Sequence, residues 1–314
     1  MNVAETMIST QPLTIEQKRP RSRRRLAVAV AGYAGLTLAA AFLIIPLLWA
    51  ISASFTPLEK VTENAYPFTW RAFFPTDFTL AAYRSLFTGN SRQGLSQATG
   101  IIGGGFGRAL INSLIISLVN VVVGGLIAAM AGFALARFQF PGKRLVFGLV
   151  LISIMIPMEV IIIPLFILVM DLRWVNTWQG MLLPMLSSGV AVFLFRQAFS
   201  DLPQDFIDAA RVDGASWLQI FFGVALPLSL PVIVSAGLFL FLETWNAFFW
   251  PLVVASQPDM RVVQVAVSLA KQERRVIWNQ LMAGSILAAA IPILIMLPFQ
   301  RYYVSGLVDT GLRE

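Results

Sequence analysis

The sequence lacks both cysteine and histidine in all of its 314 residues. Without cysteine there are no disulfides, thiolate nucleophiles or soft metal sites, and without histidine the commonest metal ligand and the commonest general base are missing. Charged residues are also scarce, at 12% against roughly 25% in an average soluble domain. Few routes to enzymatic chemistry remain.

What the sequence has instead is apolar: 57% of its residues are hydrophobic, and the mean hydropathy is +0.76. Several apolar runs exceed the roughly 18 to 20 residues that cross a bilayer as a helix, whereas the strands of an outer-membrane barrel would alternate. We therefore predict an all-α polytopic membrane protein with six transmembrane helices. The predicted spans are residues 26–50, 109–136, 145–170, 179–199, 229–255 and 281–303.

The first run follows a polar tail, residues 1–25, that ends in the basic cluster 18–25. The run is too long for a signal peptide, whose apolar core is about 7 to 15 residues, so we expect an uncleaved helix and a cytoplasmic N-terminus. Because six is an even number, the C-terminal tail 308–314 is then cytoplasmic as well. Residues 51–107, with several prolines and glycines, are predicted to be extracytoplasmic, and residues 108–307 to form the core.

The formal net charge of +7 is interpreted as reflecting which loops lie in the cytoplasm, where Lys and Arg are enriched, and not as a sign of nucleic-acid binding. The overall asymmetry of Lys and Arg is weak, so the orientation depends on the basic clusters at 18–25 and 137–144. The glycine-rich stretch 100–107 is interpreted as a linker, because no strand precedes it and no Gly-Lys-Ser/Thr follows it.

Small residues form a stripe in the second predicted span, at Gly124, Ala128 and Gly132. Such a stripe lets another helix approach closely. The partner is either another helix of the same chain or a helix of another subunit, and the sequence leaves both open.

One polar stretch, 205-DFIDAARVDGASWLQIFFGVALP-227, lies between the apolar runs. Asp201 is predicted to cap a helix that starts near Leu202. Asp213 and Gly214 predict a turn, and Ser216 is expected to cap a second helix. An amphipathic helix lying in the lipid interface is one interpretation, but such helices are usually rich in Lys and Arg, whereas this one is acidic. Its charge and its alanines favour docking into a groove of a protein partner on the cytoplasmic side.

The stretch 208-DAARVDGASWLQIFFGVALPLSLP-231 resembles the EAA loop of permease subunits of ATP-binding-cassette (ABC) importers. That motif is Glu-Ala-Ala, two residues, Asp-Gly-Ala, and a later Phe and Pro. One departure is Asp208 in the Glu place, which shortens the carboxylate by one methylene, so its contact with a basic group of the ATPase is expected to be shorter, shifted or water-mediated. The resemblance implies that these residues couple the permease to its ATPase: Asp208, Ala209, Ala210, Asp213, Gly214 and Ala215.

More of the chain, from about residue 26 to 307, is similar to the carbohydrate-uptake branch of this family, which is related to the maltose-type second permease subunit. This similarity implies the type I ABC importer permease fold, with six transmembrane helices and a cytoplasmic coupling loop at 200–227. The segments that carry it are 134-ALARFQFPGKR-144, 155-MIPMEVIIIPLF-166, 195-FRQAFSDLP-203, 243-ETWNAFFWPLVV-254, 283-AGSILAAAIPIL-294 and 300-QRYYVSGL-307.

The resemblance implies a transport subunit without an ATPase site of its own, and the sequence contains no Gly-x-x-x-x-Gly-Lys-Ser/Thr. The implied partners are a second permease subunit in a heterodimer, two ATPase subunits that bind ATP and Mg²⁺, and an extracytoplasmic substrate-binding protein. No cofactor in this chain and no nucleic acid are expected. The implied location is the bacterial cytoplasmic (inner) membrane, where a multi-pass chain surrounded by lipid takes up a sugar or sugar derivative.

Ionisable residues inside spans are candidates for the translocation pathway, because a charge at that depth is costly unless it faces a partner or a wet cavity. Glu159 lies between two prolines of the third span, and Glu243 lies near the middle of the fifth, with Asn246 three residues on. The rings of Trp245 and Trp250 are suited to stacking on sugar faces. Alternatively, these groups pair with the second permease subunit and only hold or gate the pathway.

Two other classes of function are considered. A stand-alone proton-coupled secondary transporter would use the two intramembrane glutamates as proton carriers, but the two halves of the chain lack convincing internal similarity. A membrane enzyme with paired carboxylates is disfavoured by the absence of His, Cys and a metal-spaced carboxylate cluster. The permease of an ABC importer is the leading interpretation, with the secondary transporter as its alternative.

Overall fold

The computed structural model describes residues 23–65, 69–75, 77–88, 105–186, 188–271 and 276–300. The predicted tail 308–314, most of the predicted tail 1–25 and most of the glycine-rich stretch 100–107 lie outside the described residues. The chain consists of two compact units, Met1–Leu48 and Trp49–Glu314.

The N-terminal unit contains most of α1 (Arg23–Ser54), a single long apolar helix. Its candidate span, Val28–Ser54, has a mean hydropathy of 2.3, and none of its most apolar window is buried within the chain. A helix of this length and hydropathy is suited to crossing a membrane as one element.

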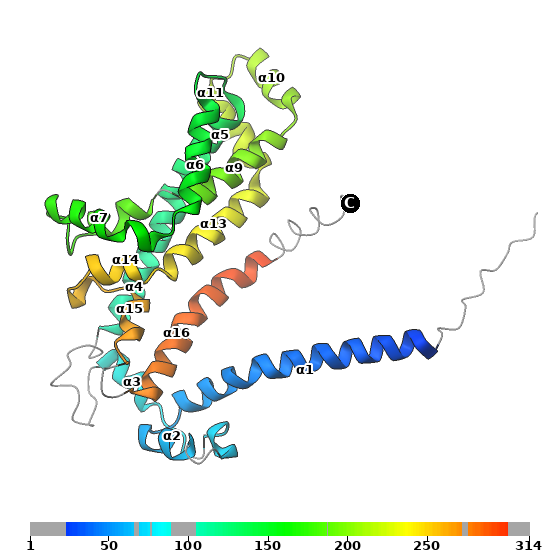
Figure 1. Cartoon of the computed structure of the whole chain (residues 1–314). Coiled ribbons are helices and arrows are strands. Elements are labelled where there is room, and N and C mark those ends of the chain that lie inside the picture. The colour runs from blue at the N-terminus through cyan, green and yellow to red at the C-terminus, as the bar shows by residue number, and fades with distance from the viewer. Residues whose placement is uncertain are drawn as a thin grey trace, which may run out of the picture. The chain divides into compact units, whose positions relative to one another are not determined.

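The main unit is built from helices, and every named element among its described residues is helical (Figure 1). Two of these elements, η2 and η4, are π-helices, and η1, η3, η5 and η6 are 3-10 helices. In chain order the elements are α2 (Leu58–Ala65), η1 (Trp70–Ala72), α3 (Ala81–Thr88), α4 (Phe106–Val119), η2 (Asn120–Gly124), α5 (Gly125–Arg137), α6 (Lys143–Met155), α7 (Met158–Asp171), α8 (Trp178–Leu182), η3 (Leu183–Met185), α9 (Gly189–Asp201), α10 (Gln204–Val212), α11 (Trp217–Ile220), η4 (Phe221–Ala225), α12 (Leu226–Leu228), α13 (Leu230–Trp245), α14 (Phe249–Val254), η5 (Pro258–Met260), α15 (Val263–Ser268), α16 (Trp278–Met296) and η6 (Leu297–Phe299).

The number of spans depends on how bent helices are counted. By length and composition, three described helices can cross a membrane alone: Val28–Ser54, Phe106–Arg137 and Trp278–Phe299. Three further pairs of helices pass the same test only as bent pairs, so the described residues hold up to six spans. The sequence predicts six spans, but three of them, 145–170, 179–199 and 229–255, are not continuous helices; in 179–199 the segments Trp178–Met185 and Gly189–Asp201 are bent by 43°.

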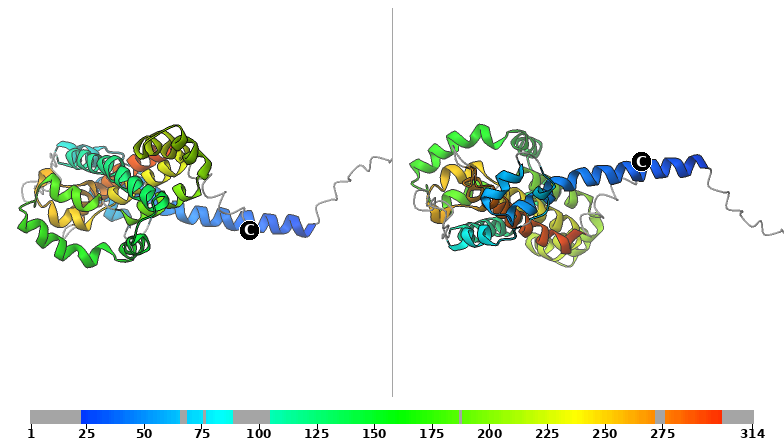
Figure 2. Two further views of the ribbon diagram at one scale, coloured as in Figure 1. Left: turned by 90° about the horizontal axis from the view of Figure 1, so that it is seen from above. Right: turned by 90° about the horizontal axis from the view of Figure 1, so that it is seen from below.

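The predicted third span, 145–170, is broken where α6 and α7 meet at a bend of 102°. Pro157 lacks a backbone donor and disfavours helical dihedrals at Ile156, which is extended. Figure 2, which views the molecule from above and from below, shows α7 running sideways from the end of α6. The sequence reveals the proline but not the size of the bend.

The predicted fifth span, 229–255, starts at one break in the helix and contains a second. The segment Trp217–Leu228 is bent by 85° relative to α13, with the break at Ser229. At its other end α13 stops at Trp245, and the chain passes through a short break into α14. Breaks of this kind are tolerated in a membrane only where the freed backbone is covered by protein or lines a wet cavity.

The small-residue stripe packs against α9 of the same chain. A Cβ added to Gly132 would lie 2.7 Å from the Phe195 Cβ and 2.8 Å from the Arg196 backbone nitrogen, closer than real side chains approach. Ala128 is 2% exposed and belongs to the core cluster that contains Phe195. The stripe therefore serves packing within the chain, and the alternative of a subunit interface is not needed to explain it.

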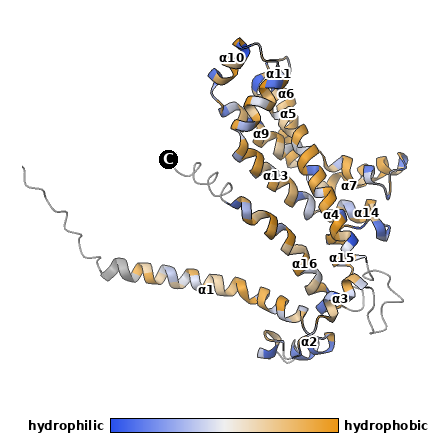
Figure 3. Cartoon of the chain, turned by 180° about the vertical axis from the view of Figure 1, so that it is seen from behind, coloured by the Kyte–Doolittle hydropathy of each residue, from blue (hydrophilic) through white to orange (hydrophobic). Residues whose placement is uncertain are grey.

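The two ends of the main unit carry different elements. Figure 1 shows α10 and α11 at one end and α2, α3 and α15 at the other. Figure 3 shows hydrophilic turns on α10, whereas α5, α9 and α13 beside it are mostly hydrophobic. The polar helix-turn-helix therefore projects from an apolar bundle.

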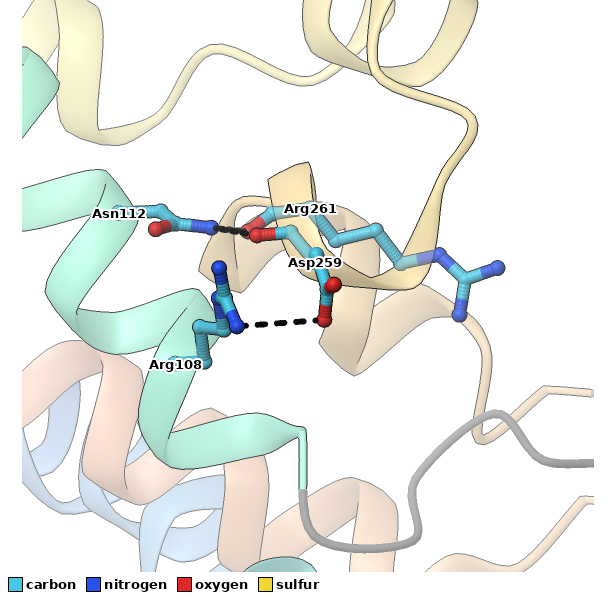
Figure 4. A network of polar contacts seen from close by, with 4 residues as sticks. All are labelled: Arg108, Asn112, Asp259 and Arg261. Atoms are coloured by element: carbon cyan, nitrogen blue, oxygen red, sulfur yellow. Dashed lines mark hydrogen bonds and ion pairs between the residues drawn. The ribbon is translucent and has the colours of Figure 1, made fainter. Parts of the chain in front are cut away.

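At the opposite end, a polar network fixes the loop between α14 and α15 to α4 (Figure 4). Arg108 pairs with Asp259 of η5, with Nη1 and Oδ1 3.4 Å apart. Asn112, which is 3% exposed, donates hydrogen bonds of 2.9 Å to the main-chain oxygens of Asp259 and Arg261. Because a buried amide is costly to leave unpaired, these bonds hold the loop in place.

Candidate functional site

The first helix of the polar element, α10, begins later than predicted. Asp201 does not cap it, because Asp201 is the last residue of α9 and Pro203 occupies the N-cap position of α10. The Asp201 carboxylate instead accepts hydrogen bonds from Gln197 Nε2, at 3.4 and 3.2 Å. The prediction failed because the four-residue pattern did not reveal that α9 extends to Asp201.

The turn after α10 has the predicted glycine geometry. Gly214 has a φ of +81°, in the left-handed region. Its N–H donates to the carbonyl of Arg211 (3.1 Å), and the N–H of Ala215 donates to the carbonyl of Ala210 (2.9 Å). These two bonds form a Schellman motif, which closes the helix and satisfies carbonyls that would otherwise be free.

Ser216 caps the second helix, α11, as predicted. Its hydroxyl accepts from the N–H of Gln219 (3.4 Å), and the Gln219 side chain accepts from the N–H of Ser216 (2.8 Å). This capping box satisfies two donors at the helix start. Both sides of the turn are therefore fixed by local hydrogen bonds.

The helix-turn-helix is anchored to the bundle through its inner face. Ile207 of α10 is 1% exposed and belongs to a core cluster with aromatic residues of α5, α9 and η4. Trp217 lies edge-on to Phe138, with ring centroids 4.9 Å apart. The Arg211 guanidinium lies 4.8 Å from the centre of the Trp217 ring, a cation–π contact between the two helices of the element.

Arg137, at the end of α5, connects the bundle to the start of α10. Its guanidinium donates to the Leu202 carbonyl (2.6 Å) and to the side-chain oxygen of Gln204 (2.8 Å). Gln204 in turn donates to the Asp208 carboxylate (3.0 Å). The sequence-based interpretation used the 137–144 cluster only for orientation, so this role of Arg137 was missed.

The six predicted coupling residues divide by exposure. Asp208, Ala209, Asp213 and Gly214 are exposed, whereas Ala210 and Ala215 are partly buried against the core cluster. Two apolar side chains of α10 were not among the predicted residues, although Phe206 is 52% and Val212 is 87% exposed. The exposed surface of α10 and its C-cap thus carries three acids, Asp205, Asp208 and Asp213, against one arginine, Arg211, together with apolar side chains, a combination suited to a protein groove. The exposed side chains of α10 and its C-cap are Gln204, Asp205, Phe206, Asp208, Ala209, Arg211, Val212 and Asp213.

The hydrogen bonds of Arg137 lead to a prediction. Arg137→Met keeps much of the side-chain length but removes both hydrogen bonds, so α10 is expected to open more often, with amide exchange across Gln204–Val212 faster by about tenfold. Hydrogen exchange followed by mass spectrometry measures this. Arg144→Met is the matched control, because Arg144 is an exposed arginine of the neighbouring α6. Equal exchange in the two variants would contradict the role of Arg137.

The two tryptophans predicted for the pathway are buried inside the chain. Trp245 is 1% exposed, donates from Nε1 to the Ala288 carbonyl (3.0 Å) and stacks on Phe241. Trp250 is 2% exposed and donates to the Met181 carbonyl (3.3 Å). Neither ring presents an open face for a sugar, so the expectation of direct stacking is corrected. Through these hydrogen bonds Trp245 holds α13 against α16, and Trp250 holds α14 against α8.

The polar residues predicted for the pathway are exposed instead. Glu159 lies in the first turn of α7, just after the 102° bend. Glu243 and Asn246 lie at the end of α13, where the helix stops. The Glu243 carboxylate accepts a hydrogen bond from the Ser188 hydroxyl (3.4 Å). The structure thus places the acids at helix breaks rather than within continuous helices.

Comparison with known proteins gives the family. Residues 121–307 match the family described as binding-protein-dependent transport system inner membrane component. The arabinooligosaccharides transport system permease protein AraQ of Halalkalibacterium halodurans is 35% identical over 282 residues, which cover 88% of this chain and 95% of the relative. The sn-glycerol-3-phosphate transport system permease protein UgpE of Salmonella typhi is 33% identical over 243 residues, which cover 76% and 86%.

The fold also matches solved structures. A chain of a bacterial ABC transporter involved in the import of the acidic polysaccharide alginate aligns with a TM-score of 0.74 at 20% identity, over 90% of this chain and 98% of that chain. Together with the family match, this confirms the predicted all-α permease fold of type I ABC importers. The chain belongs to the family of inner membrane components of binding-protein-dependent transport systems.

Proposed function

We propose that the chain is the permease subunit of an ABC importer that takes up a sugar or sugar derivative. A separate ATPase subunit binds ATP and Mg²⁺ and hydrolyses the nucleotide, and this chain has no catalytic site and no cofactor of its own. The family and the names of the relatives, which include an arabinooligosaccharide and a glycerol 3-phosphate permease, support this proposal.

The observation that carries the proposal is the geometry of the helix-turn-helix α10–α11. Its outer face is acidic and apolar, its inner face is anchored by Ile207, and its turn is closed by a Schellman motif. A rigid projection of this kind fits a groove of an ATPase subunit better than it fits anionic lipid. We assign the contact with the ATPase to the exposed residues Asp208, Ala209 and Asp213. Ala210 and Ala215 pack against the core cluster, and Gly214 forms the turn between the two helices.

Coupling follows from this rigidity. Because Arg137 ties α10 to α5, a displacement of α10 by the ATPase moves the bundle instead of bending the loop. On the other side, α11 continues through η4 and α12 to the bend at Ser229 and then into α13. ATP binding at the ATPase pair thereby shifts the population of the helix bundle toward the outward-facing state.

The translocation pathway is formed together with a second permease subunit. We assign Glu159, Glu243 and Asn246 to its wall, because polar groups exposed at this depth need water or a polar partner. Trp245 and Trp250 are buried beneath that wall and hold its helices in position. The assembly contains two ATPase subunits and an extracytoplasmic binding protein, and the multi-pass chain lies in the bacterial inner membrane with both termini in the cytoplasm.

The turn at Gly214 gives a prediction for transport. Gly214→Val places a branched side chain at positive φ, which costs about 1 to 2 kcal/mol, so the turn is expected to distort and ATP-dependent uptake to fall severalfold. Gly214→Asn is the control, because asparagine tolerates the left-handed region. Uptake by reconstituted complexes measures both variants, and wild-type uptake with valine would refute the assignment of this turn.

The proposed function is tested by expressing the chain with its neighbouring permease, ATPase and binding protein and purifying through this subunit. An ATPase that co-purifies and is stimulated by the loaded binding protein is the expected result. A chain that purifies alone and moves solute into liposomes without ATP would support the proton-coupled secondary transporter instead.

A further inference from the structure

Three polar side chains, two of them exposed and Gln264 half-buried, line the end of α13 and the neighbouring α15. Glu243 and Asn246 are three residues apart, so they lie on the same side of α13, and both are exposed. Gln264 of α15 donates to the side-chain oxygen of Asn246 (3.3 Å). Asn246 is itself held by a hydrogen bond to the Leu242 carbonyl (2.9 Å). The line is therefore fixed in place by contacts within the chain.

This line does not face hydrocarbon. An ionisable side chain exposed to lipid at this depth is costly, and it normally faces a water-filled cavity or a polar partner. The break between α13 and α14, next to Asn246, is a second sign of the same surroundings, because broken backbone is tolerated in a membrane only where it is covered or wet. The exposed side of this line therefore faces water or a polar partner, and the pathway proposed above, which a second permease subunit completes, supplies both.

The charge on this line comes from Glu243 alone. The Ser188 hydroxyl that donates to Glu243 also accepts from the N–H of Ala191 at the start of α9. A negative charge beside a helix N-terminus is stabilised by the peptide dipoles. Within the part of the chain that the structure describes, no lysine or arginine pairs with Glu243.

Other charges near this line are few. From α13 to the end of α15, residues 230–268, the sequence contains two further charged residues, Asp259 and Arg261, and the next charged residues are Lys271 and, outside the described residues, Glu273, Arg274 and Arg275. Asp259 is paired with Arg108, and the Arg261 side chain points away from that pair (Figure 4). Among the described residues no cation pairs with Glu243, so its carboxylate gives this stretch of the pathway a local negative potential.

From this arrangement we infer that Glu243 determines charge selectivity: it accepts hydrogen bonds from the hydroxyls of a neutral saccharide and repels anionic sugars such as sugar phosphates and uronates. The inference rests on the proposed function and narrows it. It assigns the chain to neutral substrates, although the relatives include permeases named for both a neutral oligosaccharide and a phosphate ester. Asn246 and Gln264 continue the hydrogen-bonding surface without adding charge.

The absence of cysteine makes the local potential measurable. Asn246→Cys introduces the only thiol of this chain, so its modification can be followed by the intact mass of the chain, whatever cysteines the partners contain. The thiol is treated in the assembled complex in nanodiscs, with and without ATP and vanadate, using a cationic and an anionic methanethiosulfonate reagent of similar size. The measured quantity is the ratio of the two modification rates.

In the Asn246→Cys variant, the ratio of the cationic to the anionic modification rate is expected to be about tenfold higher than in the double variant that also carries Glu243→Gln. High salt should reduce this difference. Ala81→Cys on the exposed surface of α3 is the control, because α3 lies at one end of the unit and its ratio should not respond to Glu243→Gln.

Two results would overturn the inference: a thiol at position 246 that neither reagent reaches while the thiol at position 81 reacts, or a ratio that Glu243→Gln leaves unchanged. ATP hydrolysis is measured on the same samples. Hydrolysis by a co-purified ATPase together with an unchanged ratio rejects only the role of Glu243, whereas the absence of any associated ATPase rejects the importer assignment itself.

Discussion

Replacing Ala209 by arginine is expected to prevent the ATPase from associating with the permease and to abolish ATP-dependent uptake, while the chain itself folds normally. Ala209 is exposed on the outer face of α10, so a longer side chain finds room in the free chain. In the proposed groove the same side chain would clash and leave a charge without water. A buried unpaired charge costs several kcal/mol, so the affinity for the ATPase should fall by about a hundredfold or more.

Co-purification of the ATPase in detergent measures this effect, with uptake by reconstituted complexes as the second readout. Ala81→Arg is the matched control, because Ala81 is also an exposed helical alanine and α3 lies at the opposite end of the main unit. Ala210→Arg is a poorer probe, since Ala210 is partly buried and its replacement would also disturb the loop. An Ala209→Arg chain that binds its ATPase as wild type does would show that α10 docks elsewhere.

The second large effect is expected at Gly132, where α5 contacts α9. Gly132→Ala places a Cβ 2.7 Å from the Phe195 Cβ and 2.8 Å from backbone, so the two helices must move apart. Overpacking of this kind costs typically 1 to 3 kcal/mol, against the roughly 0.5 to 1 kcal/mol that alanine normally gains over glycine in a helix. The variant should therefore unfold at a lower temperature and give less protein in detergent.

Gly148→Ala is the control, because a Cβ at Gly148 has nothing within 4 Å in this chain. Thermal unfolding in the same detergent compares the two variants. The control should match or exceed the wild type in Tm. If Gly132→Ala were as stable as Gly148→Ala, the close approach of α5 and α9 would not be needed for the fold.

Local features of the helix-turn-helix were predictable from the sequence because their causes lie within a few residues. The positive φ of Gly214 follows from the Asp-Gly pair, and the cap at Ser216 follows from the Ser-x-x-Gln spacing. The cap predicted at Asp201 failed for the complementary reason. Whether a residue ends one helix or starts the next depends on how far the first helix is stabilised by packing, which a four-residue pattern does not contain.

Features that depend on contacts between distant segments were not predictable. Apolar length located the spans, but the same hydropathy describes a straight helix and two helices at 102°. Trp245 was expected to face a sugar, and its burial against Ala288 depends on α16, which lies more than thirty residues further along the chain. The hydrogen bonds of Arg137 to Leu202 and Gln204 join α5 to the start of α10 and have no local signature.

The length of α1 has a consequence for the membrane around this protein. Its candidate span of 27 residues is about 40 Å long at 1.5 Å per residue, whereas the hydrocarbon core of a typical bilayer is about 30 Å thick. A helix with this mismatch tilts, or its ends extend into the headgroup region, or the bilayer thickens around it. The same helix would stand more upright in a thicker bilayer, so lipid chain length becomes a variable that sets its inclination.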